Sequence, residues 1–292
     1  MNLTITGYST ALFSTWFFVD ELGILFDVGD GASAGLLQKA RRVKHVFVSH
    51  ADRDHLTGLF QFNQLNARNG FPVIHFPKDC GSFPYLADFT SKFDPHVGGT
   101  GWNPLAYGDT VQLKKGLEVE AIRNNHVPAA EELSKSLTFR VWTTRTKLKD
   151  EYLNLPGKEI KALREKLGEA EMTYQVRENV LTYSGDTPVD DFSRYDGSKV
   201  LIHEATFLGG NENIPDKAAN KHSTLEEVLE MVAQIKIGML ILSHFSTRYA
   251  HDKIDDRIRL LCEKYKIGIP VYRVLPGQIH RDILNEKPIW EG

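Results

Sequence analysis

Four apolar, strand-like runs of this chain each end directly in residues that can bind a metal ion or move a proton. The four ends are, in chain order, the segment 49–58 (SHADRDHLTG), Asp186, the pair His203 and Glu204, and His244. Proteins that mix helices with sheets gather their chemical groups where strands end at one edge. If the four strands lie side by side, these ends converge. The sequence therefore predicts a layered α/β structure with a polar, chemically active edge.

The densest of these ends places four potential ligands, His50, Asp52, Asp54 and His55, within six positions. Imidazole and carboxylate together suit zinc, iron or manganese. Alternate positions on an extended segment point their side chains the same way, so three of the four can face one ion. The competing interpretation is a polar loop that opens a helix, with Asp54 as its N-cap and His55 in solvent.

Length and composition limit the remaining possibilities. A chain of 292 residues without a long Pro/Gly/Ser linker favours one domain, and 41% hydrophobic with 25% charged residues is ordinary for a globular enzyme. The net charge of −3 gives no global basic signature for nucleic acid or anionic membrane. Cys80 and Cys262 are far apart, which argues against a disulfide framework and a thiolate zinc site. With neither a signal peptide nor a membrane-length apolar stretch in view, we expect a cytoplasmic protein.

Hydrophobic periodicity predicts alternating strands and helices. Strands are expected at 3–6, 16–19, 23–27, 43–49, 72–76, within 110–122, and at 137–143, 179–183, 199–202, 239–242 and 271–275. Helices are expected at 33–42, 56–66, 159–168, 224–235 and 253–265. His45, His75 and His96 lie in apolar strand or loop context without partners at ligand spacing, so they are expected to be structural.

The motifs together resemble the metallo-β-lactamase superfamily. The segment His50-x-Asp52-x-Asp54-His55 resembles its HxHxDH signature, and further ligand positions are matched, in order, by His126, by Asp186 in SGDT and by His244 in SHFSTRY. Two further motifs resemble the ribonuclease Z (tRNA 3′-processing endonuclease) branch: residues 203–206 read HEAT and residues 222–224 read HST. The resemblance extends from Leu3 to about Tyr249.

This resemblance implies a fold, an activity and partners. It implies a single domain over 1–292 with the four-layer αβ/βα sandwich, two mixed sheets flanked by helices, and an arm at about 145–178 that is reduced or altered. It implies a ribonuclease Z-like phosphodiester hydrolase that acts on RNA, with pre-tRNA as a candidate substrate, or on a smaller phosphodiester through metal-activated hydroxide. A homodimer with two divalent metal ions, zinc as the first candidate, is also implied, and no membrane partner is expected.

Residue roles follow from the same resemblance. The first metal site would use His50, position 52, His126 and Asp186, and the second would use Asp54, His55, Asp186 and His244. Asp54 would orient the attacking water or act as base, while His222, held by Glu204, would protonate the departing 3′-oxygen. Asp27 and His203 would support the ligands from behind, although Asp27 also fits a simple turn before Gly29. Arg248 would contact a substrate phosphate.

Two departures from the family pattern keep alternatives open. Position 52 is Asp where the family has His, so the first site could be weaker or tuned toward iron or manganese, and a diiron redox protein or a metal-impaired binding protein is a possible reading. The family's Gly/Pro-rich, tRNA-binding arm is replaced by Leu155-Pro156-Gly157 and a short charged helix. A paralogous hydrolase of a cyclic nucleotide or a lactone is therefore the alternative within hydrolases.

Overall fold

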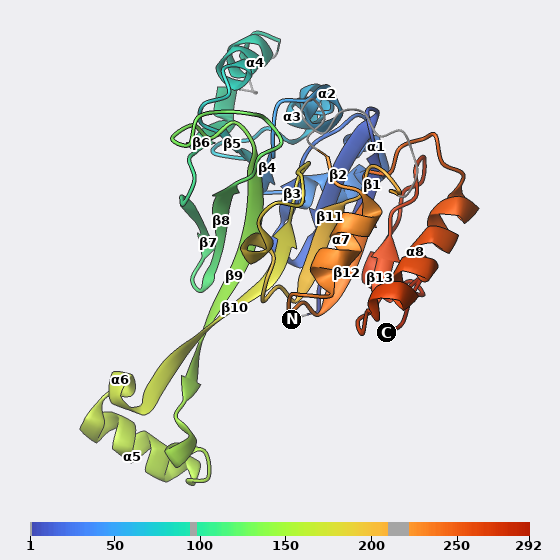
Figure 1. Cartoon of the computed structure of the whole chain (residues 1–292). Coiled ribbons are helices and arrows are strands. Elements are labelled where there is room, and N and C mark those ends of the chain that lie inside the picture. Colours follow the sequence, from blue (N-terminus) through green and yellow to red (C-terminus); the bar gives the residue numbers. More distant parts are fainter. Residues whose placement is uncertain (1, 94–97, 210–221) are drawn as a thin grey trace.

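Two facing β-sheets form the body of the protein. The computed structural model describes residues 2–93, 98–209 and 222–292, so His96 lies outside the described residues. The six-stranded sheet has the order β1-β2-β3-β4-β5-β6, and the seven-stranded sheet has the order β13-β12-β11-β10-β9-β8-β7 (Figure 1). Both sheets are mixed. In the first, β1 to β3 pair antiparallel and β3 to β6 pair parallel. In the second, β7 to β10 pair antiparallel and β10 to β13 pair parallel.

The strands follow the predicted apolar runs closely. Their bounds are β1 Ile5–Thr10, β2 Ser14–Val19, β3 Ile24–Phe26, β4 His45–Phe47, β5 Val73–Pro77, β6 Gly101–Leu105, β7 Thr110–Lys114, β8 Leu117–Arg123, β9 Leu137–Leu148, β10 Thr173–Tyr183, β11 Val200–Glu204, β12 Met239–Ser243 and β13 Val271–Arg273. Strand β6 is not among the predicted elements. It contains Pro104 and lies at the edge of its sheet, where a missing N–H is tolerated.

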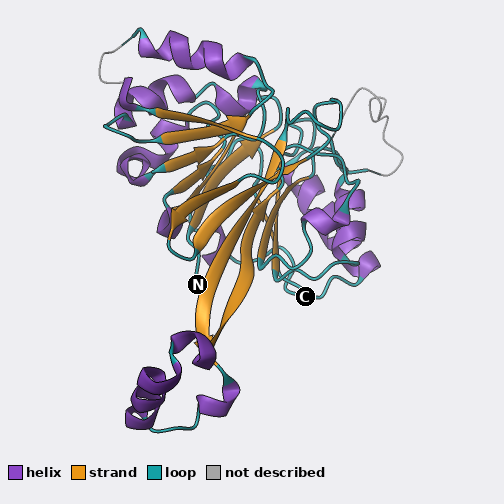
Figure 2. Cartoon of the chain, turned by 90° about the vertical axis from the view of Figure 1, so that its left-hand side faces the viewer, coloured by secondary structure: helices purple, strands orange, loops and turns teal. Residues whose placement is uncertain are grey.

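Helices cover the outer face of each sheet (Figure 2). Their bounds are α1 Ala32–Leu36, α2 Arg53–Leu56, α3 Leu59–Asn66, α4 Ser82–Ser91, α5 Gly157–Leu167, α6 Glu169–Met172, α7 Leu225–Val232 and α8 His251–Tyr265. Short 3-10 helices cover Asp20–Leu22, Leu37–Arg42, Asp150–Tyr152, Phe192–Arg194 and Ile283–Asn285. The predicted helix 33–42 is therefore divided, because Leu37 adopts a positive φ of 51°. No described helix is long and apolar enough to cross a membrane.

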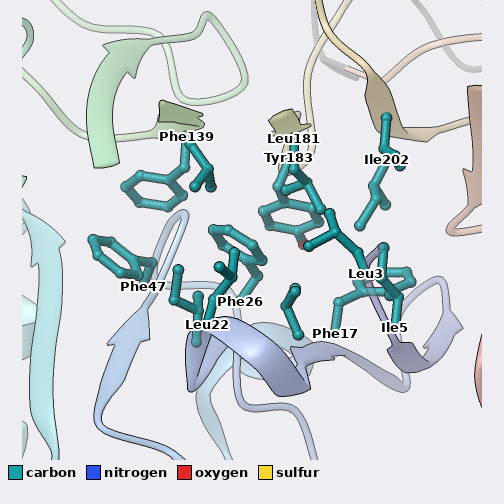
Figure 3. Close-up of a cluster of buried hydrophobic side chains, with 14 of the residues drawn as sticks. Leu3, Ile5, Phe17, Leu22, Phe26, Phe47, Phe139, Leu181, Tyr183 and Ile202 are labelled. Carbon is teal, nitrogen blue, oxygen red and sulfur yellow. The ribbon is translucent and has the colours of Figure 1, made fainter. Parts of the chain in front are cut away.

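Three apolar layers hold the sandwich together. The central layer lies between the sheets and includes Phe26, Phe47 and Phe139, whose rings lie 5.2 to 6.1 Å apart (Figure 3). One outer layer packs the first sheet against α1 and α3, and the other packs the second sheet against α7 and α8. The parallel strands β3, β4, β11 and β12 are thus covered on both faces, which explains their apolar runs. The two mixed sheets flanked by helices confirm the predicted fold class.

The segment predicted to be an altered arm projects from this body (Figures 1 and 2). Strand β9 pairs with β8 only as far as Thr143, and β10 pairs with β11 only at its last two residues. Beyond these points β9 and β10 pair with each other, out to the pair Leu148 and Thr173. The tip carries α5 and α6, and no residue of α5 is buried. The arm is thus a two-stranded ribbon with a helical tip.

Candidate metal centre

The predicted convergence of strand ends occurs at one edge of the sandwich. The ligand-rich segment 49–58 follows β4, His126 follows β8, Asp186 follows β10, and His244 follows β12. The segment 49–58 is fixed by a close backbone contact: Gly58 N–H donates to the Val28 carbonyl at 2.8 Å, and a Cβ on Gly58 would lie 2.2 Å from the Gly29 oxygen. Only glycine fits there, so the turn after the ligands is held against the end of β3.

Four of the predicted ligands form an enclosed group. Asp54, His55, Asp186 and His244 each offer one atom, and these atoms lie within 4.8 Å of one another. The Asp186 Oδ2 atom is 3.2 Å from His55 Nε2 and 3.3 Å from His244 Nε2. Asp54 Oδ2 is also 3.3 Å from His244 Nε2, and its side chain is 11% exposed. We call these four residues the enclosed half-site.

The remaining ligands form a second, open group. His50, Asp52 and His126 bring one atom each within 4.8 Å, with Asp52 Oδ2 at 3.5 Å from His50 Nε2 and 3.4 Å from His126 Nε2. Asp186 Oδ2 lies 3.8 Å from His50 Nε2, so this carboxylate adjoins both groups. The Asp52 side chain is 58% exposed. We call His50, Asp52 and His126 the open half-site.

Asp52 adopts a position that its local structure does not require. It is the N-cap residue of α2, yet its side chain accepts no cap hydrogen bond. An N-cap Asp ordinarily uses its carboxylate on the first turn of the helix. Here the carboxylate lies 3.4 Å from His126 Nε2 and 3.5 Å from His50 Nε2, and these two imidazoles hold the pKa of Asp52 well below its usual value. The alternative of a helix-opening loop with Asp54 as N-cap and His55 in solvent is therefore wrong, because Asp52 is the N-cap residue and His55 is buried.

The two half-sites have matching donor sets. Each offers two imidazoles and one carboxylate of its own, and Asp186 adds a shared carboxylate between them. Histidine in place of Asp52 would instead give the open half-site a third imidazole. With Asp at position 52, the two groups are therefore chemically alike, although Asp52 is much more exposed than Asp54.

The polar atoms of the centre fit divalent cations. Within the described residues, the buried Nε2 atoms of His50 and His55 have no hydrogen-bond partner. Both rings are held by the opposite nitrogen, His50 Nδ1 against Ser49 Oγ at 2.9 Å and His55 Nδ1 against Asp27 Oδ2 at 2.7 Å. Buried polar atoms without partners are costly, and oriented imidazoles with carboxylates are the usual ligands of zinc, iron and manganese.

Asp27 holds the ligand segment from beneath, as one of its two predicted roles requires. It is fully buried, accepts hydrogen bonds from Ser49 N at 2.7 Å and from the Tyr183 hydroxyl, and contacts His55 Nδ1. Burial opposes a charged His55, but Asp186 and Asp27 outweigh it and hold the pKa of His55 well above its usual value. A carboxylate behind a ligating imidazole fixes both its tautomer and its direction.

Replacing Asp27 with Asn is expected to lower cation affinity by about 10- to 100-fold. The uncharged Asn side chain holds the His55 ring less firmly and does not raise the basicity of its imidazole as the Asp27 carboxylate does. Cation titration of the purified variant, followed by calorimetry, measures this loss. Asp30→Asn is the matched control, since Asp30 is exposed and three residues away. Equal affinities of the Asp27 variant and the parent chain would contradict the supporting role of Asp27.

Glu204 and His222 form a pair beside the half-sites. His222 Nδ1 lies 3.0 Å from Glu204 Oε1 and 3.8 Å from Asp186 Oδ2. Glu204 is buried and also accepts hydrogen bonds from the backbone amides of Thr187, Ser223 and Thr206 at 3.0 to 3.1 Å. Burial alone would lower the pKa of His222, but the neighbouring carboxylates raise it to about 9. The imidazole is thus oriented and charged at neutral pH.

The two other predicted site residues lie farther from the half-sites. His203 alternates with Glu204 along β11, so it faces the helical layer: its ring packs edge-on against Tyr195, and its Nδ1 donates to the Glu204 carbonyl at 2.7 Å. The ring contacts none of the candidate ligands, so His203 does not support them from behind as predicted. Arg248 is exposed and lies over the Phe207 ring, which in turn contacts His222.

Sequence reasoning missed three groups that hold the ligands in place. The Leu12 amide donates to Asp54 Oδ2 at 3.1 Å, Ser9 Oγ accepts from the His244 amide at 2.9 Å, and Thr206 Oγ1 lies 2.9 Å from His244 Nδ1. Thr206 belongs to the HEAT motif, so it could have been found. Leu12 lies in the turn after β1, and Ser9 lies near the end of β1, 235 residues before His244 in the chain. No sequence signal marks either residue.

Curated relatives match most of the chain. It is 27% identical over 268 residues to tRNase Z TRZ1 of Arabidopsis thaliana, covering 89% of each chain, and 28% identical over 274 residues to the chloroplastic tRNase Z TRZ2 of the same plant, covering 90% of this chain and 73% of that one. Ribonuclease Z of Pyrococcus furiosus is 27% identical over 280 residues, covering 87% of each. No family model matches the chain.

Solved structures agree with the fold. The metallo-β-lactamase fold protein YhfI from Bacillus subtilis superposes with a TM-score of 0.64 at 13% identity, covering 95% of this chain and 99% of that one. The human short-form tRNase Z superposes with a TM-score of 0.59 at 16% identity, covering 95% and 98%. The sequence similarity to ribonucleases Z and this fold support each other. Over most of its length the chain is therefore similar in sequence to ribonucleases Z, and it has the fold of the metallo-β-lactamase proteins.

Proposed function

We propose that this chain is a metal-dependent phosphodiester hydrolase, a ribonuclease Z-like endoribonuclease that cleaves RNA. The observation that carries the proposal is the Glu204–His222 pair, which lies beside two half-sites that share Asp186. Hydrolysis of a phosphodiester needs an activated water, neutralisation of charge on the phosphate and a proton for the departing oxygen. The centre has candidate residues for each requirement.

The side chains divide these tasks. Two divalent cations, when bound, would supply an activated water and offset charge on the phosphate. Asp54, held by the Leu12 amide, orients the water and accepts its proton. His222 gives the proton to the departing 3′-oxygen from Nε2, because Nδ1 is engaged by Glu204. Glu204 keeps the imidazole charged and in one orientation. Arg248, on the rim beside Phe207, contacts a substrate phosphate.

The proposed cofactors are two divalent cations, with zinc as the first candidate because imidazoles and carboxylates are its usual ligands. His50, Asp52, His126 and Asp186 would hold one ion, and Asp54, His55, Asp186 and His244 would hold the other. With Asp52, the open half-site has one more carboxylate and one fewer imidazole than it would have with His at this position. This donor set favours manganese or iron more than a set with three imidazoles would. A diiron redox protein is for this reason the second candidate function, and an iron-dependent spectrum that responds to oxygen would support it.

Replacing Asp52 with His is expected to raise the zinc affinity of the open half-site about tenfold, because an imidazole nitrogen replaces an oxygen donor. Competition with a colorimetric zinc chelator measures the change. Asp52→Asn is the matched variant, since it removes the charge without adding an imidazole, and it should weaken zinc binding. Unchanged zinc affinity in both variants would remove Asp52 from the ligand set.

Pre-tRNA is the proposed RNA substrate. The relatives carry tRNase Z names, and the projecting arm, residues 144–178, offers a surface far from the centre on which a folded RNA could rest. A homodimer and a cytoplasmic location are further proposals by resemblance. Both cysteines are free, which suits a reducing compartment.

A pre-tRNA with a 3′ trailer tests the proposal, run beside a cyclic-nucleotide and a lactone panel. Cleavage at the 3′ end of the tRNA, dependent on added divalent cation, is expected. Turnover of a cyclic nucleotide or a lactone by protein that leaves pre-tRNA intact would favour the paralogous hydrolase instead.

A further inference from the structure

A cavity of about 370 Å³ lies at the end of the sandwich opposite the metal centre. It is lined by residues just before β3 and β4, including Gly23 and Lys44, whereas Asp27 and His50 follow the other ends of these strands. The β7–β8 hairpin of the second sheet closes its other side through Leu113, Lys114 and Leu117. The cavity is large enough for a small organic molecule and shares no residue with the half-sites.

Two of the positively charged side chains that line this cavity, Lys44 and Lys114, have no partner among the described residues. Its two acidic side chains are engaged: Asp20 contacts Arg42 at 2.7 Å, and both carboxylate oxygens of Glu21 accept hydrogen bonds from Thr4. The cavity therefore presents two ammonium groups without an ion-pair partner in the described part of the chain, beside the hydrogen-bonded carboxylate of Glu21 and above an apolar floor of leucines, Leu22, Leu113 and Leu117.

A chain of hydrogen bonds fixes a third donor at the wall. The Asn103 amide nitrogen lies 2.9 Å from His75 Nδ1, and His75 Nε2 lies 3.1 Å from His45 Nδ1. The Asn103 amide donates, so His75 Nδ1 accepts and the proton of neutral His75 is on Nε2. That proton is donated to His45 Nδ1, which leaves the proton of neutral His45 on its own Nε2.

Both rings are neutral, as this assignment requires. Burial lowers the pKa of His75 to about 3, and burial together with the Lys44 charge lowers the pKa of His45. His45 lines the cavity, and within the described residues its Nε2 has no partner. The wall of the cavity therefore combines an oriented N–H donor with two ammonium groups.

We propose that this cavity is a binding site for a small organic phosphate, with the phosphoryl group on Lys44, Lys114 and His45 and an apolar portion on the leucine floor. Two ammonium groups match the double charge of a phosphoryl group better than a single carboxylate charge. The site goes beyond the proposed RNA cleavage, since it lies at the far end of β3 and β4 and contributes nothing to the half-sites.

Calorimetric titration of the purified full chain with phenylphosphonate, which cannot be hydrolysed at a phosphoester, tests the site. We expect saturable binding that weakens about tenfold or more in the Lys44→Ala/Lys114→Ala variant. His45→Ala should also weaken it, whereas His45→Gln, which keeps an N–H donor, should retain more of the affinity. The matched control Lys158→Ala/Lys166→Ala removes two exposed charges from the arm and should bind as the parent does.

Three results would overturn the proposal. One is unchanged affinity in the Lys44→Ala/Lys114→Ala variant. Another is loss of all binding in Asp186→Asn, which would place the probe at the metal centre. The third is benzoate binding as tightly as phenylphosphonate, which would contradict the phosphoryl preference. None of these measurements depends on RNA cleavage, so failure here and failure of the proposed endoribonuclease activity are distinguishable.

Discussion

Replacing Asp186 with Asn is expected to remove cations from both half-sites and to lower RNA cleavage by roughly 10³-fold or more. Asp186 Oδ2 lies 3.2 to 3.8 Å from imidazole nitrogens of both groups, so among the described residues it is the single carboxylate common to them. Asn keeps the shape of the side chain but removes its negative charge, and each half-site then retains only one carboxylate for a divalent cation.

Plasma mass spectrometry of the purified Asp186→Asn variant measures the cation content, and turnover of RNA and of bis(p-nitrophenyl) phosphate measures activity. Both substrates should lose activity together, because both need the activated water. Asp256→Asn is the control, since Asp256 is exposed on α8. Two retained cations with cleavage near that of the parent chain would contradict the bridging role.

Replacing His222 with Ala is expected to separate two substrates. RNA cleavage should fall by about 10²- to 10³-fold, because the departing 3′-oxygen of ribose is a poor leaving group without a proton. Hydrolysis of bis(p-nitrophenyl) phosphate should fall by less than about tenfold, because nitrophenolate leaves without one. His222 is held 3.0 Å from Glu204 and lies in neither of the groups assigned to the two cations.

Parallel kinetics on the two substrates check this separation, with cation content measured on the same preparations. Glu204→Gln keeps a hydrogen-bonding group but removes the charge that raises the pKa of His222, so it should show the same selectivity in weaker form. His251→Ala is a control at a histidine that contacts the Pro276 carbonyl instead. Equal losses on RNA and on the nitrophenyl ester would contradict the proton-donor assignment.

Much of the fold could be predicted because its parallel strands are buried on both faces. Runs such as 199–202 and 239–242 are continuously apolar, and the polar residue that ends each run marks the sheet edge. The helix α4 and the strand β6 were not predicted. Pro84 lies in the first turn of α4 and Pro104 lies within β6, so both elements carry a residue that ordinarily signals a break.

From the sequence we could predict which residues of the candidate site follow the ends of strands, but not how their side chains are arranged. The sequence indicates that Asp186, Glu204 and His244 converge, but it does not give the faces on which side chains fall. His203 illustrates the difference: it adjoins Glu204 in the HEAT motif, yet strand alternation turns it toward Tyr195. The matching of the two half-sites around Asp186 also needed the structure, because it depends on which side chains approach each other.

Cleavage of a pre-tRNA with a 3′ trailer by protein loaded with two cations per chain tests the proposed function most directly, with the ends of both products mapped. We expect a cut at the 3′ end of the tRNA that leaves a 3′-hydroxyl on the tRNA, is abolished by chelation and restored by divalent cation. An intact pre-tRNA after incubation with fully loaded protein that still hydrolyses bis(p-nitrophenyl) phosphate would contradict it.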